Sequence, residues 1–342
     1  MPTVIDTSTY FPMTRGTKMH YTMTVDNEPA VSAILVAAED FSSLKHVLFY
    51  LAGQTISGQI EIVLVGPRAA DASLAELKLE GFFGYQTVAM PQPGFSAAEG
   101  YGAGIRQARA PVVVLCEDHS FPEPDWAEHL LRAHEQPWAA VGPAVRNGNP
   151  ETLLSWVDFF MGYSEWAYPV PSGIRQHLPG HNSSYKRDLL LEYDTALIDR
   201  LEAESVLHWD LGRRGYQLYL ESQAVTRHLN FALFSTWFPL HFWSGRRFAS
   251  TRGRGWPLWR CLLYVCASPL IPLVRFRRIF AEARKPGRYP GSLLRLAPVL
   301  LLGLLLDGFG QMLGYAFGPG DTMEKSAELE LHIEKRVGVS PS

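Results

Sequence analysis

A continuous apolar run that ends in acidic side chains is the feature that most constrains the fold of this chain. The run Val112–Cys116 reads VVVLC and is followed at once by Glu117, Asp118 and His119. Such a run predicts a strand buried on both faces, as in a parallel sheet covered by helices. In open α/β sheets the ligand crevice lies outside the carboxyl ends of the strands. The sequence therefore predicts a binding site at this triplet, and the prolines at 122 and 124 are expected to stop the strand.

The triplet has two interpretations. Two carboxylates and an imidazole at a strand end can hold a divalent cation against a phosphate. Because imidazole suits Mn²⁺ better than Mg²⁺, the presence of His119 favours Mn²⁺. The alternative is a solvated acidic turn after a core strand, and the triplet alone favours neither.

The chain before the triplet predicts a β-α-β unit. Residues Val31–Asp40 read VSAILVAAED and predict a strand, the leucines and Val47 of Phe41–Gln54 fall at helical spacing, and Ile60–Val65 predicts a second strand. Two strands joined by a helix form a parallel pair with a right-handed crossover. The glycine-rich segment from Phe95 to Ile105 predicts a helix, whose glycines favour close packing on the sheet over phosphate binding.

Charge is distributed unevenly along the chain. The net charge is −3, but residues 241–300 contain twelve basic residues and one acidic residue, so this segment carries +11 and the rest about −14. Basic residues interleaved with tryptophan and leucine favour an anionic membrane surface as partner. No nucleic-acid motif accompanies them, so nucleic acid is not expected as a partner.

The cysteines and the first residues indicate the compartment. Cys116, Cys261 and Cys266 have no metal-binding spacing, and three thiols cannot all pair, so reduced thiols and a cytoplasmic location are expected. Residues 1–30 lack the basic start and apolar core of an export signal and are expected to form a partly ordered extension.

Several short motifs, in order, resemble those of family 2 glycosyltransferases, which have the GT-A fold. The chain has VSAILVAAED from Val31, a helix ending in Gln54, EIVLVG from Glu61 and the EDH triplet followed by PEPDW. Three more follow: PGHNSSYKRD from Pro179, Glu204 before RRGY from Arg213, where the family has L-x-x-R-x-x-G-Y, and a strand ending in VTRH at His228. The resemblance covers residues 31–230 and implies an α/β domain with a mostly parallel sheet, helices on both faces, and transfer of a sugar from a nucleotide-sugar.

The resemblance also implies roles for individual residues. The inverting transfer needs a carboxylate that deprotonates the acceptor, and Glu204 occupies that place. The expected metal ligands, for Mn²⁺ rather than Mg²⁺, are Asp118, His119 and His228. The expected nucleotide-sugar contacts are Ala37, Ala38, Glu39, Glu117, Asp118, His181 and Asn182. The chain departs from the family pattern at Gly66, Tyr101 and Ser205, where an aspartate, a basic residue and an aspartate are usual.

Two long apolar runs follow the predicted enzyme domain. They extend over residues 256–274 and 293–317, and each approaches the ~20 residues that span a bilayer. Spanning twice would place the basic loop between them on the far side, which the positive-inside rule opposes. We therefore expect helices that lie in the cytoplasmic leaflet of a bacterial inner membrane, attached through residues 241–317. The alternative is a buried helical hairpin in a soluble protein.

These inferences predict four parts and one activity. The parts are residues 1–30, an enzyme domain over 31–230, a membrane-associated helical region over 231–320 and a polar tail over 321–342. The predicted activity is transfer of a sugar to a lipid-linked or polysaccharide acceptor at the cytoplasmic membrane face. Two other classes remain open: a non-catalytic GT-A module that binds a sugar or a partner, and a nucleotidyltransferase, although AAEDFSS lacks the latter's glycine-rich basic loop. The sequence contains no indication of an oligomeric state.

Overall fold

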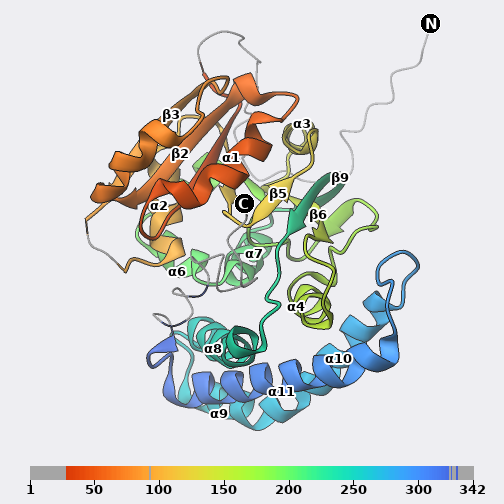
Figure 1. Cartoon of the computed structure of the whole chain (residues 1–342). Helices are drawn as coiled ribbons and strands as arrows, with labels where there is room; N and C mark the ends of the chain where they lie inside the picture. Colours follow the sequence, from red (N-terminus) through yellow and green to blue (C-terminus); the bar gives the residue numbers. More distant parts are fainter. Residues whose placement is uncertain (1–27, 92–93, 323–324, 326–328, 330–342) are drawn as a thin grey trace, which may run out of the picture.

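The computed structural model describes residues 28–91, 94–322, 325 and 329. The predicted N-terminal extension and most of the polar tail lie outside the described residues. The described chain consists of two parts, an α/β unit and a group of helices along one side of it (Figure 1).

The first half of the sheet is parallel, as the β-α-β pattern predicts. Its strands lie in the order β3-β2-β1-β4, with bounds β1 Val31–Val36, β2 Ile60–Pro67, β3 Gly84–Met90 and β4 Val112–Cys116. All five side chains of β4 are buried, because helices cover both faces of the sheet. The predicted central strand is therefore confirmed.

The second half of the sheet is mixed. It continues from β4 through β8 (Ser184–Lys186), β6 (Ala140–Asn147), β9 (Leu218–His228) and β5 (Ser120–Pro122), with β7 (Gly173–Arg175) also on β9. The strand predicted to end at His228 is the long β9, whose pairing with β6 shifts register between Pro143 and Ala144. One prediction needs correction here. Pro122 does not stop β4 but ends a short strand of its own, because its pairing with Thr226 needs no proline N–H.

Helices cover both faces of this sheet. In the first part of the chain, the helices are η1 (Phe41–Leu44), α1 (Lys45–Ala52), η2 (Ser57–Gln59), η3 (Arg68–Glu76), α2 (Ala97–Gln107) and α3 (Trp126–His134). A Cβ on Gly100 would lie 2.7 Å from Val36, and one on Gly104 would lie 2.3 Å from Ile34. The glycines of α2 therefore serve close packing on β1, as expected, and a capping box of Ser96 and Glu99 begins the helix.

The remaining helices of the α/β unit connect it to the C-terminal region. They are α4 (Leu153–Tyr163), α5 (Arg187–Leu191), α6 (Ala196–Leu201) and α7 (Glu204–Arg213). The aromatic residues of α4 pack as core, because Phe159 and Phe160 are fully buried.

The C-terminal region consists of α8 (Phe234–Arg252), α9 (Leu258–Ala267), η4 (Ser268–Leu270), α10 (Ile271–Ala283) and α11 (Leu293–Phe317). These helices lie together below the sheet in Figure 1. The second apolar run forms α11 as predicted, while α8 was not predicted because Pro239 and scattered polar residues obscure its periodicity. A Cβ on Gly245, Gly310 or Gly314 would lie 2.1–2.4 Å from the backbone of the facing helix, so α8 and α11 pack closely. The predicted α/β fold with C-terminal apolar helices is confirmed.

Two segments are long and apolar enough to cross a membrane, by length and composition only. They are Leu258–Ala283, with a mean hydropathy of 1.3, and Leu293–Phe317, with a mean hydropathy of 1.8. In the most apolar 18-residue stretch of each segment, only 11% of the residues of the first and 39% of those of the second are buried in the described structure. Low burial of apolar helices weakly suggests membrane association.

Candidate active site

The Glu117 carboxylate lies at the end of β4 among three imidazoles. Its oxygens are 3.3 Å from His119 Nε2, 3.4 Å from His228 Nε2 and 3.7 Å from His181 Nε2. The side chain is 9% exposed, and His119 and His228 are almost completely buried. The structure therefore brings together residues from three distant parts of the sequence, and this cluster excludes a simple solvated turn.

Strand pairing places these side chains. His228 ends β9 opposite Ser120 of β5, and the Leu229 amide donates to the His119 carbonyl at 3.0 Å. On the other side, the Asn182 amide donates to the Leu115 carbonyl at 2.6 Å. Asn182 has a φ of 62°, which asparagine tolerates better than most residues, and its side-chain amide donates to Glu117 at 3.4 Å.

The two buried imidazoles are oriented by their second nitrogen atoms. His119 Nδ1 lies 2.6 Å from Asp118 Oδ1, and His228 Nδ1 lies 2.9 Å from Asn230 Oδ1. If a metal occupies the cluster, a proton on each Nδ1 directs the Nε2 lone pair to the ion; without a metal, Nε2 can instead carry a proton and donate to Glu117. Metal-ligating histidines show this arrangement, with an outer carboxylate or amide oxygen that fixes the tautomer.

The donor set fits a divalent cation. Ligand atoms of Glu117, His119 and His228 all lie within 4.8 Å of one another. Ligands on opposite sides of an ion with bonds of ~2.1 Å are ~4.2 Å apart, so a small side-chain movement closes the set. Two nitrogens and a carboxylate suit Mn²⁺ and other transition metals better than Mg²⁺. The cluster contains two of the predicted ligands and has Glu117 in place of Asp118, which contacts His119 instead.

Electrostatics favour an ionised Glu117. Burial raises the pKa of this carboxyl group, but the charges of His119 and His181 and the hydrogen bonds of His119 and His228 outweigh burial and hold the pKa well below its usual range. A negative charge is therefore available at the centre of the cluster.

Glu204 begins α7 and faces the same cluster. Its Oε1 lies 3.1 Å from His181 Nε2, so His181 connects Glu204 to Glu117. Gly180 lies directly against this carboxylate, because a Cβ there would be 2.5 Å from Glu204 Cδ. His181 and Glu204 are 28% and 20% exposed, so the cluster is open to solvent on this side.

Comparison with known proteins identifies this part of the chain. Residues 54–194, less than half of the chain, match the family model described as glycosyl transferase family 2. This part of the chain is therefore similar to family 2 glycosyltransferases. One solved structure that it resembles is described as GalNAc-T7 with UDP, GalNAc and Mn²⁺, with a TM-score of 0.44 and 11% identity. The match covers 58% of this chain and 43% of that one, so the chain spans less than half of that protein's length. No match was found among curated proteins.

Two of the three departures from the family pattern have local causes. A Cβ on Gly66 would lie 2.9 Å from the ring of Phe41, so the aspartate usual there would displace this buried ring. The Tyr101 hydroxyl donates to the Cys116 carbonyl at 2.8 Å and so supports the end of β4. Nothing in the structure explains Ser205.

The predicted base-binding residues lie at the same sheet edge as the cluster. Leu35 of β1 pairs with Cys116 of β4, so Ala37, Ala38 and Glu39 follow β1 where Glu117 and Asp118 follow β4. The Ala37 amide donates to the Val65 carbonyl at 2.8 Å and Ala37 is buried, whereas Glu39 is exposed. These predicted donor contacts therefore lie at the same edge of the sheet as Glu117.

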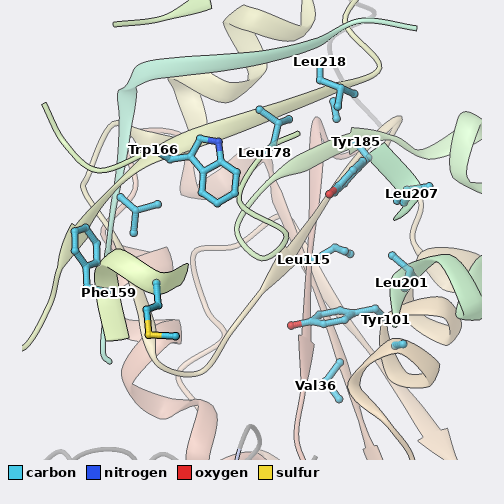
Figure 2. Close-up of a cluster of buried hydrophobic side chains, with 14 of the residues drawn as sticks. Val36, Tyr101, Leu115, Phe159, Trp166, Leu178, Tyr185, Leu201, Leu207 and Leu218 are labelled. Atoms are coloured by element: carbon cyan, nitrogen blue, oxygen red, sulfur yellow. The ribbon is translucent and has the colours of Figure 1, made fainter. Parts of the chain in front are cut away.

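A buried hydrogen-bond chain behind the cluster was not predicted. The Leu178 amide donates to His208 Nδ1 at 3.3 Å, so His208 Nε2 carries the proton and donates to the Tyr185 hydroxyl at 2.8 Å. Tyr185 in turn donates to the Gly180 carbonyl at 3.5 Å. Burial, and then the charge of His177, lowers the pKa of His208 to about 3. Figure 2 shows Leu115 of β4 between the rings of Tyr101 and Tyr185. His208 lies four residues after Glu204, and residues at this spacing share one face of a helix. This spacing could have indicated from the sequence that His208 lies near the cluster.

Proposed function

We propose that this chain is an inverting glycosyltransferase that moves a sugar from a nucleotide-sugar to a lipid-linked or polysaccharide acceptor at the cytoplasmic face of a bacterial inner membrane. The observation that carries this proposal is the link from Glu117 through His181 to Glu204, 3.7 and 3.1 Å long. It joins a cation-binding cluster to a carboxylate on the open side. Both are needed when a diphosphate leaves one face of a sugar and an acceptor attacks the other.

Three side chains would hold the metal in this proposal. These are Glu117, His119 and His228, with Asp118 and Asn230 orienting the two imidazoles. A divalent ion, when bound, neutralises charge on a diphosphate leaving group. The buried position of Glu117 at the end of β4 keeps its carboxylate in place without reorganisation during the reaction.

Glu204 is proposed as the base that accepts the proton of the acceptor hydroxyl. It is partly exposed, as a base must be to reach an acceptor, and it lies in the first turn of α7. His181 and Asn182 are proposed to line the sugar subsite, since both contact Glu117 from the loop that faces Glu204. Ala37, Ala38 and Glu39 are proposed to contact the nucleotide base.

The packing of α11 supports attachment along a membrane surface over spanning. A Cβ on Gly303, near the middle of α11, would lie 2.6 Å from Met161 of α4 and 2.9 Å from Trp237 of α8. Arg275 of α10 pairs with Asp307 of α11 at 2.6 Å and also donates to the Met161 carbonyl at 3.1 Å. The middle of α11 is therefore seated on the enzyme domain and not surrounded by lipid.

The outer side of the same helices is apolar and exposed. Leu258 and Trp259 of α9 are 74% and 67% exposed, and Leu273 of α10 and Leu305 of α11 are more than half exposed. A continuous apolar surface flanked by basic residues is typical of helices in the headgroup region of an anionic leaflet. This supports a membrane surface as the partner of the C-terminal region.

A panel of nucleotide-sugars tests the activity. The full-length protein is mixed with each donor, with Mn²⁺, Mg²⁺ or EDTA and with a lipid extract as acceptor source, and release of the nucleoside diphosphate is measured. We expect release with at least one donor, faster with Mn²⁺ than with Mg²⁺, and lost in Glu204→Gln. Tight donor binding without release under any condition would instead support a non-catalytic binding module.

A further inference from the structure

A cavity rich in arginine lies between the enzyme domain and the C-terminal helices. Its walls come from α6 and α7 on one side, β7 and the start of β9 on a second, and α8 and α9 on a third, and its volume is about 860 Å³. This is within the ~300–1,000 Å³ typical of small-molecule sites. We call it the arginine cavity after the six arginines in its wall, which are Arg175, Arg200, Arg213, Arg252, Arg254 and Arg260.

Half of these arginines have no carboxylate partner in the described part of the chain. Arg254 pairs with Asp199, and Asp210 lies 2.5 Å from Arg213 and 3.8 Å from Arg200. The described residues place no carboxylate within ion-pair distance of the others, which are Arg175, Arg252 and Arg260. The cavity wall therefore carries an excess of positive charge that the protein itself does not neutralise.

Aromatic rings hold two of these guanidinium groups in place. Arg260 lies over the Trp256 ring at 3.8 Å from its centroid, and Arg252 lies 5.5 Å from the same ring and 5.0 Å from that of Trp209. Arg252 also donates to the hydroxyls of Tyr315 and Tyr264 at 3.2 and 3.3 Å. Such contacts orient a guanidinium without cancelling its charge, and they leave some of its five N–H donors unused.

Unsatisfied polar atoms also point to a ligand. Thr251 is 7% exposed and lines the cavity, and its buried hydroxyl has no hydrogen-bond partner among the described residues. The Nε atom of Arg200, which also lines the cavity, is likewise buried without a partner among these residues. A threonine within a helix commonly bonds a backbone carbonyl one turn earlier, but this one does not. Buried polar atoms in folded proteins are nearly always satisfied by protein, water or ligand.

We propose that the arginine cavity binds the phosphate or diphosphate group of a ligand distinct from the donor bound at the Glu117 cluster. Guanidinium groups recognise phosphate through paired N–H donors, and three uncompensated arginines match the two or more charges of such a group. The cavity begins at Val206, two residues after Glu204 on α7, and extends away along that helix to Arg213. It is a separate site, because its wall contains neither Glu204 nor any of the four residues that form the cluster.

The position of the cavity allows two sources of the phosphate. Arg260 and Trp256 are close in sequence to Leu258 and Trp259, which belong to the exposed apolar surface. A lipid headgroup can therefore reach the cavity while its chains contact that surface, and a soluble phosphate compound can reach it from solvent. The chemistry recognised is the same in both cases. Phosphate binding in the arginine cavity does not depend on the proposed sugar transfer, so binding measurements without turnover can test it.

Calorimetry with pyrophosphate tests the soluble source. The full-length protein in detergent is titrated in EDTA, so that the Glu117 cluster holds no metal, and Arg260→Gln and Arg252→Gln are compared with Arg277→Gln. Arg277 is an exposed arginine of α10 outside the cavity, so its variant makes the same charge change elsewhere. We expect pyrophosphate to bind about tenfold or more weakly to the two cavity variants, and the control to change less than about twofold.

Vesicle flotation tests the lipid source. Phosphatidylcholine vesicles with and without phosphatidic acid are mixed with the same proteins, and we expect the gain from phosphatidic acid to fall more in Arg260→Gln than in Arg277→Gln, which removes one charge of the basic segment outside the cavity. Loss of either ligand specific to the cavity variants supports the proposal and identifies the source. Equal behaviour of all three variants with both ligands would overturn it. If Arg252→Gln disturbs folding through its tyrosine contacts, Arg260→Gln decides alone, because the Trp256 ring is the aromatic or ionic contact of Arg260 among the described residues.

Discussion

Replacing Gly180 by alanine would move the proposed base without changing its chemistry. The φ of Gly180 lies outside the left-handed region, so alanine fits the backbone. Its Cβ, however, would lie 2.5 Å from Glu204 Cδ and 2.7 Å from Oε2. Because carbon atoms rest ~3.5 Å apart or more, the carboxylate must shift by about 1 Å.

The size of the effect follows from this shift. A misplacement of ~1 Å in a catalytic group can lower the rate by ~100-fold, which corresponds to ~2.7 kcal/mol in the activation free energy. We therefore expect kcat to fall about 100-fold in Gly180→Ala, with a smaller change in donor affinity, because the displaced carboxylate contacts the proposed sugar subsite only through His181. The flexible Glu204 side chain can yield, so the free energy of unfolding should change by less than ~1 kcal/mol.

A matched control and a double variant complete the assay. Gly212 lies on α7, and a Cβ there would meet nothing within 4 Å, so Gly212→Ala should leave kcat unchanged and stabilise the fold by ~0.4–1 kcal/mol. In a Glu204→Gln background, Gly180→Ala should add little, since both changes act on one group. Normal kcat in Gly180→Ala, or a full second loss in the double variant, would refute Glu204 as the base.

Three further predictions concern the metal, pH and topology. Glu117→Gln should weaken Mn²⁺ binding by more than the ~10–100-fold of an outer-shell change, and unchanged affinity in calorimetry would remove Glu117 from the site. Burial holds the pKa of His134 and of His208 at about 3 against 6.5 unfolded, so their contribution to stability is full above pH 6.5 and is lost as the pH falls toward 3. Denaturant unfolding at pH 5.5 should show a loss of ~1.4 kcal/mol for each, and a His134→Gln variant with an unchanged pH slope would contradict this. In a cysteine-free background, Lys285→Cys and the domain control Glu76→Cys, both exposed, should react with an impermeant reagent only after the cells are opened. Labelling of Lys285→Cys alone in intact cells would mean that the helices span.

Local patterns predicted the strands and the sheet edge but not how distant residues combine. The apolar run of β4 identifies a buried strand, because few other structures accommodate five consecutive apolar residues before an acidic turn. His228 could be suspected only from its place in a motif, since its contact with Glu117 depends on the antiparallel pairing of β5 and β9. The cluster contains Glu117 where Asp118 was expected, because the direction of each side chain after the strand decides which carboxylate faces the histidines. The spacing of residues in the sequence does not specify this direction.

The C-terminal region shows the same limit. The length and hydropathy of α11 predicted a helix with the observed bounds, Leu293–Phe317. Its glycines contact α8 and α4 at positions that only the folded chain reveals, and the pairing of Asp307 with Arg275 depends on how α10 crosses α11. The arginine cavity likewise combines residues between 174 and 260, and no local pattern joins them.

The position of α4 limits which acceptors can react. Near its end, Met161 contacts α11 while the Tyr163 ring lies 4.6 Å from that of His228. These two residues are only ~3 Å apart along the helix, so the cation cluster lies close to the contact between α4 and α11. If the apolar surface rests on lipid, little more than the ~10 Å thickness of α11 separates lipid from α4. A fixed distance between the proposed site and the membrane favours acceptors whose hydroxyl lies close to the bilayer. The end of a growing glycan would lie too far from the bilayer to reach the site after its first few sugars.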